Sequence, residues 1–284
     1  MKHARPENDV NREQLDQVLD GDAQAPLEAG TQLRYKEWYE LPSGRGSSIV
    51  QVIDAGVSDK PPGLSFRRRL LGPETDLVEW FLGQPLPLPP GHRATIFREP
   101  RLPSGFPDLV IVIWNASVAE RWTPARADLN ASDLRLMHVL TCAGPQTECE
   151  LQSALSSNNM PDSLDRLVEA SMIRKENTHW NPCPLSSVFA TTQIIAVEAK
   201  VNEWRHALNQ AHLNTWFTSH SCILVPKIPR KSTMPQDARD LGVTVLTQAD
   251  VSWDLKHADQ HQPRSYISWL FNDWAWKIAS QRGV

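Results

Sequence analysis

The chain has 284 residues, of which 40% are hydrophobic and 22% are charged, and it carries a net charge of -4. These values are ordinary for a folded globular protein and exclude disorder or fibrous repeats as a description of the whole chain. The slight net acidity provides no broad attraction for nucleic acid. Any binding to a polyanion would therefore need a local basic patch or a metal ion.

Cysteines and apolar runs give expectations about location. The four cysteines include no Cys-x-x-Cys pair, which argues against a disulfide scaffold and fits a reducing compartment. No apolar run approaches the roughly 18 residues that a membrane span needs. The polar start of the chain lacks the apolar stretch of a signal peptide. We therefore expect a cytoplasmic protein without membrane partners.

The first predicted elements precede the apolar strands. Residues 1–60 are expected to form an N-terminal extension, with a charged helix at Glu7–Asp20 and a short strand at Ser48–Ile53. The helical spacing of apolar residues predicts the next helix at Glu74–Gly83, and a proline-rich hinge follows it. We assign no chemistry to the extension.

Alternating and continuous apolar runs then predict the strands of a sheet. Arg93–Arg98 alternates as a half-buried strand does, and Leu109–Trp114 is the continuous Val- and Ile-rich run of a strand buried on both faces. This pattern predicts an α/β fold, with a mixed sheet flanked by helices, over residues 61–128 and 184–284. Further strands are predicted at Gln193–Val201, Cys222–Val225 and Val243–Leu246, and further helices at Glu203–Phe217 and Ser265–Ile278.

Residues 129–183 interrupt the sheet with a different pattern. Helices are predicted to begin near Ser132, Thr147 and Pro161, and Ile173–Trp180 has the pattern of two short strands around a turn. Three helices followed by a hairpin resemble a small winged helix-turn-helix module. We therefore expect residues 129–183 to form an insertion between two strands of the sheet.

The resemblance to winged helices implies DNA contacts from Arg166, Arg174 and Lys175, because such modules commonly place the third helix in the major groove and touch phosphate with the wing. Against this, Ser132–Pro182 carries four basic and seven acidic residues, a net charge of -3, which is unfavourable next to phosphate. Direct DNA contact and protein docking both stay open as the role of the insertion.

Polar residues occur where two of the apolar strands begin or end. Asp108 precedes the run Leu109–Trp114. Glu198 and Lys200 share one face at the end of the Gln193–Val201 strand, because side chains alternate along a strand. Ionised groups in such apolar surroundings are costly unless they are paired or bind a metal ion. Mg²⁺ takes one or two carboxylates and couples to phosphate oxygens, and a nearby lysine can serve the attacking water. The pattern predicts a site for phosphodiester hydrolysis.

With Pro107 before Asp108, and Ala199 inside the triplet Glu198-Ala199-Lys200, followed by a helix and a strand, the chain resembles the PD-(D/E)xK nuclease superfamily. The resemblance implies a restriction-endonuclease-like fold. It also implies that Asp108 and Glu198 hold Mg²⁺, with Mn²⁺ as a substitute, that the Ala199 carbonyl assists, and that Lys200 serves the water. The alternative from the residues alone is an exposed Glu198–Lys200 pair at a strand end, worth about 0 to 1 kcal/mol, with Asp108 in a turn.

The same resemblance assigns supporting residues on two helices. Gln210, on the helix after the second of these strands, would point at the site. Glu79, on the helix before the first strand of the sheet, would be an outer metal or water ligand, with Glu74 as its rival. Members of the superfamily usually join the two strands by a short hairpin, whereas 90 positions separate Asp108 from Glu198. The insertion would account for this excess and would lie beside the catalytic edge.

The sequence therefore predicts a Mg²⁺-dependent DNA endonuclease that hydrolyses phosphodiester bonds. The embedded helical module suggests antiviral (phage) defence or mobile-element processing, by analogy alone. Two alternatives stay open. One is a non-catalytic DNA- or protein-binding regulator that uses the winged-helix module, and the other is a nuclease subunit active only within a larger complex. A protein partner or a homodimer is compatible with each.

Overall fold

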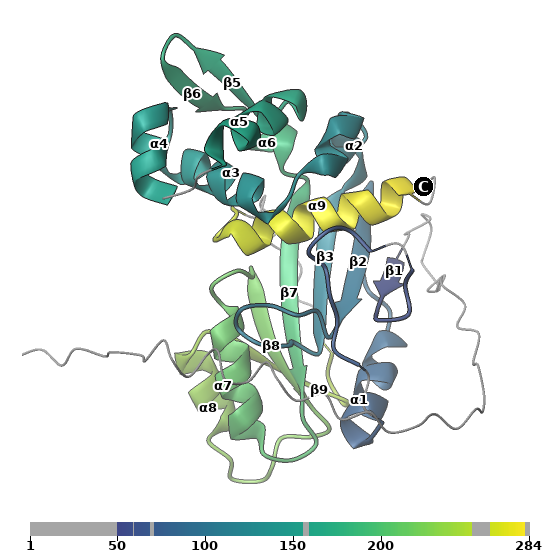
Figure 1. Cartoon of the computed structure of the whole chain (residues 1–284). Coiled ribbons are helices and arrows are strands. Elements are labelled where there is room, and N and C mark those ends of the chain that lie inside the picture. The colour runs from purple at the N-terminus through teal and green to yellow at the C-terminus, as the bar shows by residue number, and fades with distance from the viewer. Residues whose placement is uncertain (1–49, 59, 69–70, 156–158, 252–261, 282–284) are drawn as a thin grey trace, which may run out of the picture. The chain divides into compact units, whose positions relative to one another are not determined.

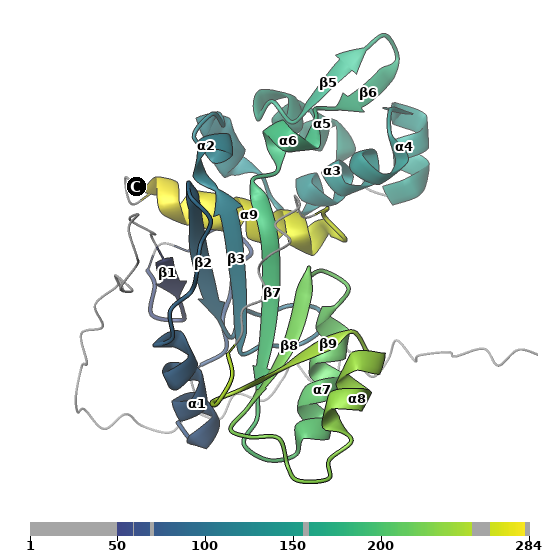
Figure 2. The same cartoon turned by 180° about the vertical axis from the view of Figure 1, so that it is seen from behind.

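The structure, a computed structural model, describes residues 50–58, 60–68, 71–155, 159–251 and 262–281. The helix expected at Glu7–Asp20 lies outside the described residues. The described residues form a mixed six-stranded sheet with helices on both faces (Figures 1 and 2), which confirms the predicted α/β class.

The six strands of the sheet have an antiparallel centre and parallel outer pairs. In chain order they are β1 (Val50–Ile53), β2 (His92–Arg98), β3 (Leu109–Asn115), β7 (Thr191–Ala199), β8 (His220–Val225) and β9 (Val243–Thr247). Their order in space is β1, β2, β3, β7, β8, β9. β3 is antiparallel to both β2 and β7, and the other neighbours are parallel. β1 thus joins the sheet, although it lies within the extension expected at residues 1–60.

Helices cover both faces of the sheet. One core cluster joins α1 to alternate residues of β3 and β7, such as Ile111 and Val197. The residues between them, such as Val112 and Ala196, point to the other face of the sheet, which α9 covers. The helix α7 packs on that same face, and α8 lies beside α7 near the edge strand β9. Of these helices, α8 was not predicted from the sequence. Their bounds are Pro73–Leu82 (α1), Trp204–Asn214 (α7), Met234–Asp240 (α8) and Tyr266–Gln281 (α9).

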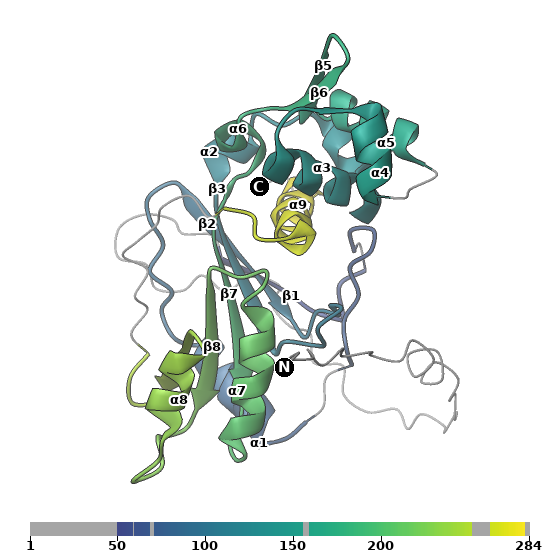
Figure 3. The same ribbon diagram turned by 90° about the vertical axis from the view of Figure 1, so that its left-hand side faces the viewer.

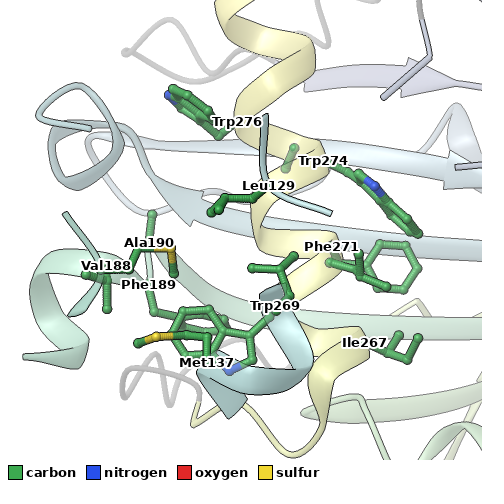
Figure 4. Packing of buried hydrophobic residues seen from close by; sticks show 14 of the residues in the cluster. Leu129, Met137, Val188, Phe189, Ala190, Ile267, Trp269, Phe271, Trp274 and Trp276 are labelled. Carbon is green, nitrogen blue, oxygen red and sulfur yellow. The ribbon is translucent and has the colours of Figure 1, made fainter. Parts of the chain in front are cut away.

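Aromatic side chains of α9 fill the core against the sheet. Trp269, Phe271 and Trp274 are buried there (Figure 4), and the Phe271 ring centroid lies 5.2 Å from that of Phe97 on β2. The tryptophan-rich composition thus serves packing in this helix, since large rings bury much apolar surface. Among the described helices, none combines the length and the apolarity that crossing a membrane requires.

Residues 116–190, called the insertion below, join β3 to its neighbour β7. Its helices α3, α4 and α5, followed by the hairpin β5–β6, match the three helices and two short strands predicted for residues 129–183. The extra strand β4 pairs with β6, so a second sheet has the order β4, β6, β5. The elements are α2 (Ala116–Ala119), η2 (Pro124–Asp128), α3 (Ala131–Ala143), β4 (Gln146–Thr147), α4 (Glu148–Leu155), α5 (Met160–Glu169), β5 (Ile173–Glu176), β6 (His179–Pro182) and α6 (Leu185–Val188).

The insertion lies at the end of the sheet opposite Asp108 and Lys200 (Figure 1), which corrects the expectation that it lies beside the catalytic edge. The chain enters the insertion after Asn115, at the end of β3, and leaves it at the start of β7. The predicted site residues lie at the other ends of the same two strands. The length of β3, about 20 Å at roughly 3.4 Å per residue, separates the two places.

Buried ionic contacts fasten the insertion to α9, which lies between the sheet and α3 (Figure 3). Arg126 of η2 and Asp273 of α9 are 0% and 1% exposed, and they form a two-point ion pair at 2.8 and 3.1 Å. Arg126 Nη2 also donates to the Val188 carbonyl at 2.7 Å, and Lys277 Nζ donates to the Leu129 carbonyl at 2.8 Å. These charges are withdrawn from water, so each depends on its partners.

We predict that Asp273→Ala lowers the free energy of unfolding by about 3 to 5 kcal/mol, because it leaves the buried guanidinium of Arg126 without its carboxylate. Glu176→Ala is a matched control, since it breaks the exposed Arg174–Glu176 pair at 2.7 Å and should cost no more than about 1 kcal/mol. Urea denaturation followed by circular dichroism measures both. Losses of equal size would show that the buried pair does not stabilise the junction.

Candidate active site

A cavity of about 460 Å³ opens where β3 begins and β7 ends, and it is lined by residues of the first turn of α1 and of α7. Its lining includes Asp108, Glu198, Lys200 and Gln210, four residues that the sequence predicted for the site. It also includes Glu74, the rival ligand on α1. The structure therefore brings residues that lie far apart in the sequence together at one end of the sheet.

The register of β3 and β7 places Asp108 across from Glu198. Leu109 pairs with Val197 in this antiparallel ladder, so the residue before Leu109 meets the residue after Val197. Asp108 Oδ2 accepts a hydrogen bond from the Ala199 amide at 2.7 Å, which ties the start of β3 to the end of β7. The strand predicted at Gln193–Val201 is β7, which begins and ends two residues before the predicted bounds. Lys200 therefore directly follows the strand instead of lying within it.

Burial raises the pKa of both carboxyl groups. The pKa of Asp108 rises to about 6, although the Ala199 amide and the Lys200 charge oppose the shift. Glu198 is 4% exposed, and burial followed by the negative charge of Asp108 raises its pKa to about 8. Asn214 Nδ2 donates to Glu198 Oε1 at 2.7 Å and lowers that pKa. Two carboxyl groups that repel in apolar surroundings form a site where a cation is stabilising.

The glutamates of α1 have different partners. Glu74 Oε2 accepts a hydrogen bond from Lys200 Nζ at 2.7 Å, at the wall of the cavity. Glu79 Oε1 accepts one from Arg98 Nη2 at 2.8 Å, and Glu79 is not among the residues that line the cavity. The structure thus places Glu74 rather than Glu79 at the site, because the first turn of α1 faces it. The alternative of an exposed Glu198–Lys200 pair is wrong, since Glu198 is buried and Lys200 bonds to Glu74.

α7 supplies two amide side chains to this end of the sheet. Gln210 lines the cavity, as the sequence predicted, and the buried Asn214 one turn later holds Glu198. Asn214 was not predicted. The sequence does carry a signal for it, because residues four apart share a face of a helix and Gln210 already marks the face toward the site.

The rim of the cavity carries Arg67, Arg98, Leu71 and Phe106. Nothing in the local sequence predicted a place on the rim for Leu71 or Phe106. The lining contains three basic and four acidic side chains. The cavity is therefore slightly acidic when all four acids are ionised, and a phosphate would then meet net repulsion there without a bound cation.

Two carboxylates with open cavity in front of them suit Mg²⁺ or Mn²⁺. Mg²⁺ takes one or two carboxylates, keeps several waters and binds phosphate oxygens. Within the part of the chain that the structure describes, no three His, Cys, Asp or Glu side chains are grouped to hold a metal ion.

The basic residues predicted to contact DNA in the insertion differ in their surroundings. Arg166 makes a two-point ion pair with the buried Asp133, at 2.7 and 2.9 Å. Its guanidinium therefore supports the insertion's own fold, and its contact with DNA stays a prediction. Arg174 and Lys175 are exposed on β5, and neither lines the cavity.

Comparison with known proteins leaves the family open. No family model and no curated protein matches the sequence. A solved structure described as protein VC1899 from Vibrio cholerae is similar with a TM-score of 0.18 and 14% identity, over 46% of this chain and 50% of that chain. A TM-score this low carries no argument about fold or function.

We predict that, without divalent cations, the protein loses stability as the pH rises from about 5 to about 8. Folding raises the pKa of Glu198 from 4.5 to about 8, so the folded state keeps a proton that the unfolded state releases in this range. This stabilisation is complete at a pH below the pKa that Glu198 has in the unfolded chain, and it is lost as the pH rises through the pKa that Glu198 has in the folded protein.

Glu198→Gln should flatten this fall and should make the protein more stable than the wild type at pH values near 8. Urea denaturation in EDTA across the pH range measures the effect. Glu120→Gln, at an exposed position outside this cavity, is the control and should leave the wild-type profile intact. A profile that Glu198→Gln does not change would contradict the raised pKa.

Proposed function

We propose that the protein is a Mg²⁺-dependent nuclease that hydrolyses phosphodiester bonds in DNA. The observation that carries the proposal is the convergence of Asp108, Glu198 and Lys200 on one cavity at the ends of two neighbouring strands. On this proposal the sheet with α1 and α7 has the restriction-endonuclease-like arrangement. The PD-(D/E)xK motif then occupies the start of β3 and the end of β7.

Asp108 and Glu198 would hold the ion, and the carbonyl of Ala199 would assist. When bound, the ion supplies positive charge for the phosphate oxygens and makes water a better nucleophile near neutral pH. The chain itself fixes both carboxylates in advance. The Ala199 amide holds Asp108, and Asn214 holds Glu198, so neither side chain has to be ordered when substrate binds.

Lys200 serves the attacking water in this proposal. Its ammonium group is held 2.7 Å from Glu74, where it can orient water and stabilise the negative charge that develops on the phosphate. The water oxygen forms a bond to phosphorus, the bond from phosphorus to one bridging oxygen breaks, and a proton of the water ends on the leaving oxygen. Gln210 is available to hold the water or a phosphate oxygen from the α7 side.

We also propose that residues 129–183 form a winged-helix-like module, because α3, α4 and α5 precede the β5–β6 hairpin, which pairs with β4. Its place at the far end of the sheet favours docking of a partner, or a remote DNA contact through Arg174 and Lys175, over a direct part in catalysis. A nuclease subunit that works only with a partner is the second candidate. The excess of acidic over basic side chains in the cavity favours it.

We predict that Lys200→Ala lowers the rate of Mg²⁺-dependent plasmid cleavage by roughly 10²- to 10⁴-fold, the usual contribution of a group that acts in general acid–base catalysis. Asp108→Asn should lower it at least as far, because it removes a carboxylate that holds the ion. Lys60→Ala removes an exposed lysine that does not line the cavity and should leave the rate unchanged. Cleavage that survives both site substitutions, or that proceeds in EDTA, would sink the proposal.

We predict that Glu74→Gln lowers the cleavage rate by roughly 10-fold or more, as expected for a hydrogen bond between charged groups worth about 1.5 to 3 kcal/mol. The Lys200 ammonium group donates to Glu74, whereas Glu79 accepts from Arg98, so Glu79→Gln, the matched change on the same helix, should have a smaller effect. Single-turnover cleavage rates of the two variants show which of the two glutamates supports the reaction. The reverse order would restore Glu79 as the ligand on α1.

A further inference from the structure

We infer that Phe106 and Leu71 form a nucleobase subsite on the rim of the cavity, for a nucleotide that is not stacked in a duplex. The inference rests on the proposed nuclease function and names its substrate class as single-stranded or locally unpaired DNA.

Phe106 and Leu71 present apolar surface that the charged site does not use. Phe106 is 36% exposed and Leu71 is 90% exposed, and both line the cavity. Of the five large hydrophobic residues that are exposed in the described part of the chain, two therefore lie at this one place. Apolar surface in water is unfavourable, and its concentration beside a site indicates a ligand with an apolar part. In a nucleic acid that part is the face of a base.

The position of Phe106 is fixed relative to the carboxylates. It lies two residues before Asp108, in the connection between β2 and β3. The backbone of Leu102 and Gly105 closes a turn in this connection with hydrogen bonds of 2.9 and 3.0 Å, and the Glu99 amide donates to the Asp108 carbonyl at 3.0 Å. A base on the Phe106 ring would thus lie at a set distance from the phosphate being cleaved.

Arg67 adds a loosely held positive charge next to the ring. Its guanidinium carbon lies 6.0 Å from the Phe106 ring centroid, the outer limit of a cation–π contact. Its Nε lies 3.9 Å from a carboxylate oxygen of Glu99, and half of the Arg67 side chain is exposed. A cation with such weak contacts can turn to a phosphate. An aromatic face and a cation side by side match the two parts of a nucleotide, the flat base and the phosphate.

Stacking decides which form of DNA fits this subsite. Bases in a duplex cover each other's faces, so a protein ring reaches a base only after it leaves the stack. Single strands offer these faces directly, and stacking on aromatic side chains is a main source of their affinity for proteins. The subsite therefore favours a single strand over a duplex.

The test measures binding of three fluorescein-labelled probes by anisotropy, in Mg²⁺ and with the full chain. They are a single strand, its duplex, and the same strand with abasic positions. All variants carry Lys200→Ala, so that the probes stay intact. We expect the strand to bind more tightly than the duplex, and the abasic strand to lose this advantage.

Phe106→Ala should weaken binding of the strand by roughly 5- to 140-fold, which is the stacking free energy of about 1 to 3 kcal/mol per base converted to affinity. Binding of the duplex should not change, and Phe106→Trp should keep the preference. Leu213→Ala is the matched control, because Leu213 is 56% exposed on α7 and does not line the cavity. Circular dichroism shows whether each variant is folded. Equal binding of strand and duplex, or an equal loss for both in Phe106→Ala, would overturn the subsite.

Cleavage by the protein with Lys200 intact separates this inference from the proposed function. If Mg²⁺ supports cleavage of the duplex as fast as that of the strand, the nuclease proposal stands and the subsite falls. If neither probe is cut in Mg²⁺ or Mn²⁺ while binding still prefers the strand and depends on Phe106, the nuclease proposal falls and base recognition stands.

Discussion

Asp108 and Glu198 lie directly opposite each other at one end of the antiparallel pair β3–β7, and this placement is unfavourable without a cation. Like charges across a strand pair destabilise a sheet, and burial makes each ionised carboxylate more costly still. The pKa of both groups is raised as a result. The Ala199 amide, the Asn214 side chain and the Lys200 charge each favour an ionised form. The neighbours thus oppose the repulsion without removing it, since the pKa of each carboxyl group stays raised.

The charge of the cavity links the ion to the substrate. The lining has four acidic and three basic side chains, so a phosphate diester meets net negative charge there once Glu198 is ionised with the other three acids. One divalent ion reverses that sign, so cation and phosphate would bind more favourably together than apart. Arg98 does not offset this, because it is paired with Glu79 at 2.8 Å. Arg67 on the rim is the basic residue with the weakest ion pair among those that line the cavity.

Strands and helices were predictable because apolar periodicity is a local property, so that Leu109–Trp114 differs from β3 by one residue. Which of Glu74 and Glu79 lies at the site could not be predicted from the sequence, since this depends on how α1 is rotated against the sheet. The predicted place of the insertion was wrong for a reason visible in the sequence. Asp108 precedes one strand and Lys200 follows the other, so an insertion in the hairpin between them leaves from the opposite end.

This geometry limits what the insertion can do. None of its described residues lines the cavity, and it is joined to the rest by β3, β7 and the buried Arg126–Asp273 pair on α9. Packed strands and buried ion pairs resist small displacements, which favours a fixed spacer over a gate. The length of β3 alone, about 20 Å, corresponds to roughly six base-pair steps at about 3.4 Å each, and β5 lies beyond that end of the sheet (Figure 1). A partner or DNA segment bound there would then set where a strand meets Asp108 and Glu198, and it would leave the chemistry at those residues unchanged.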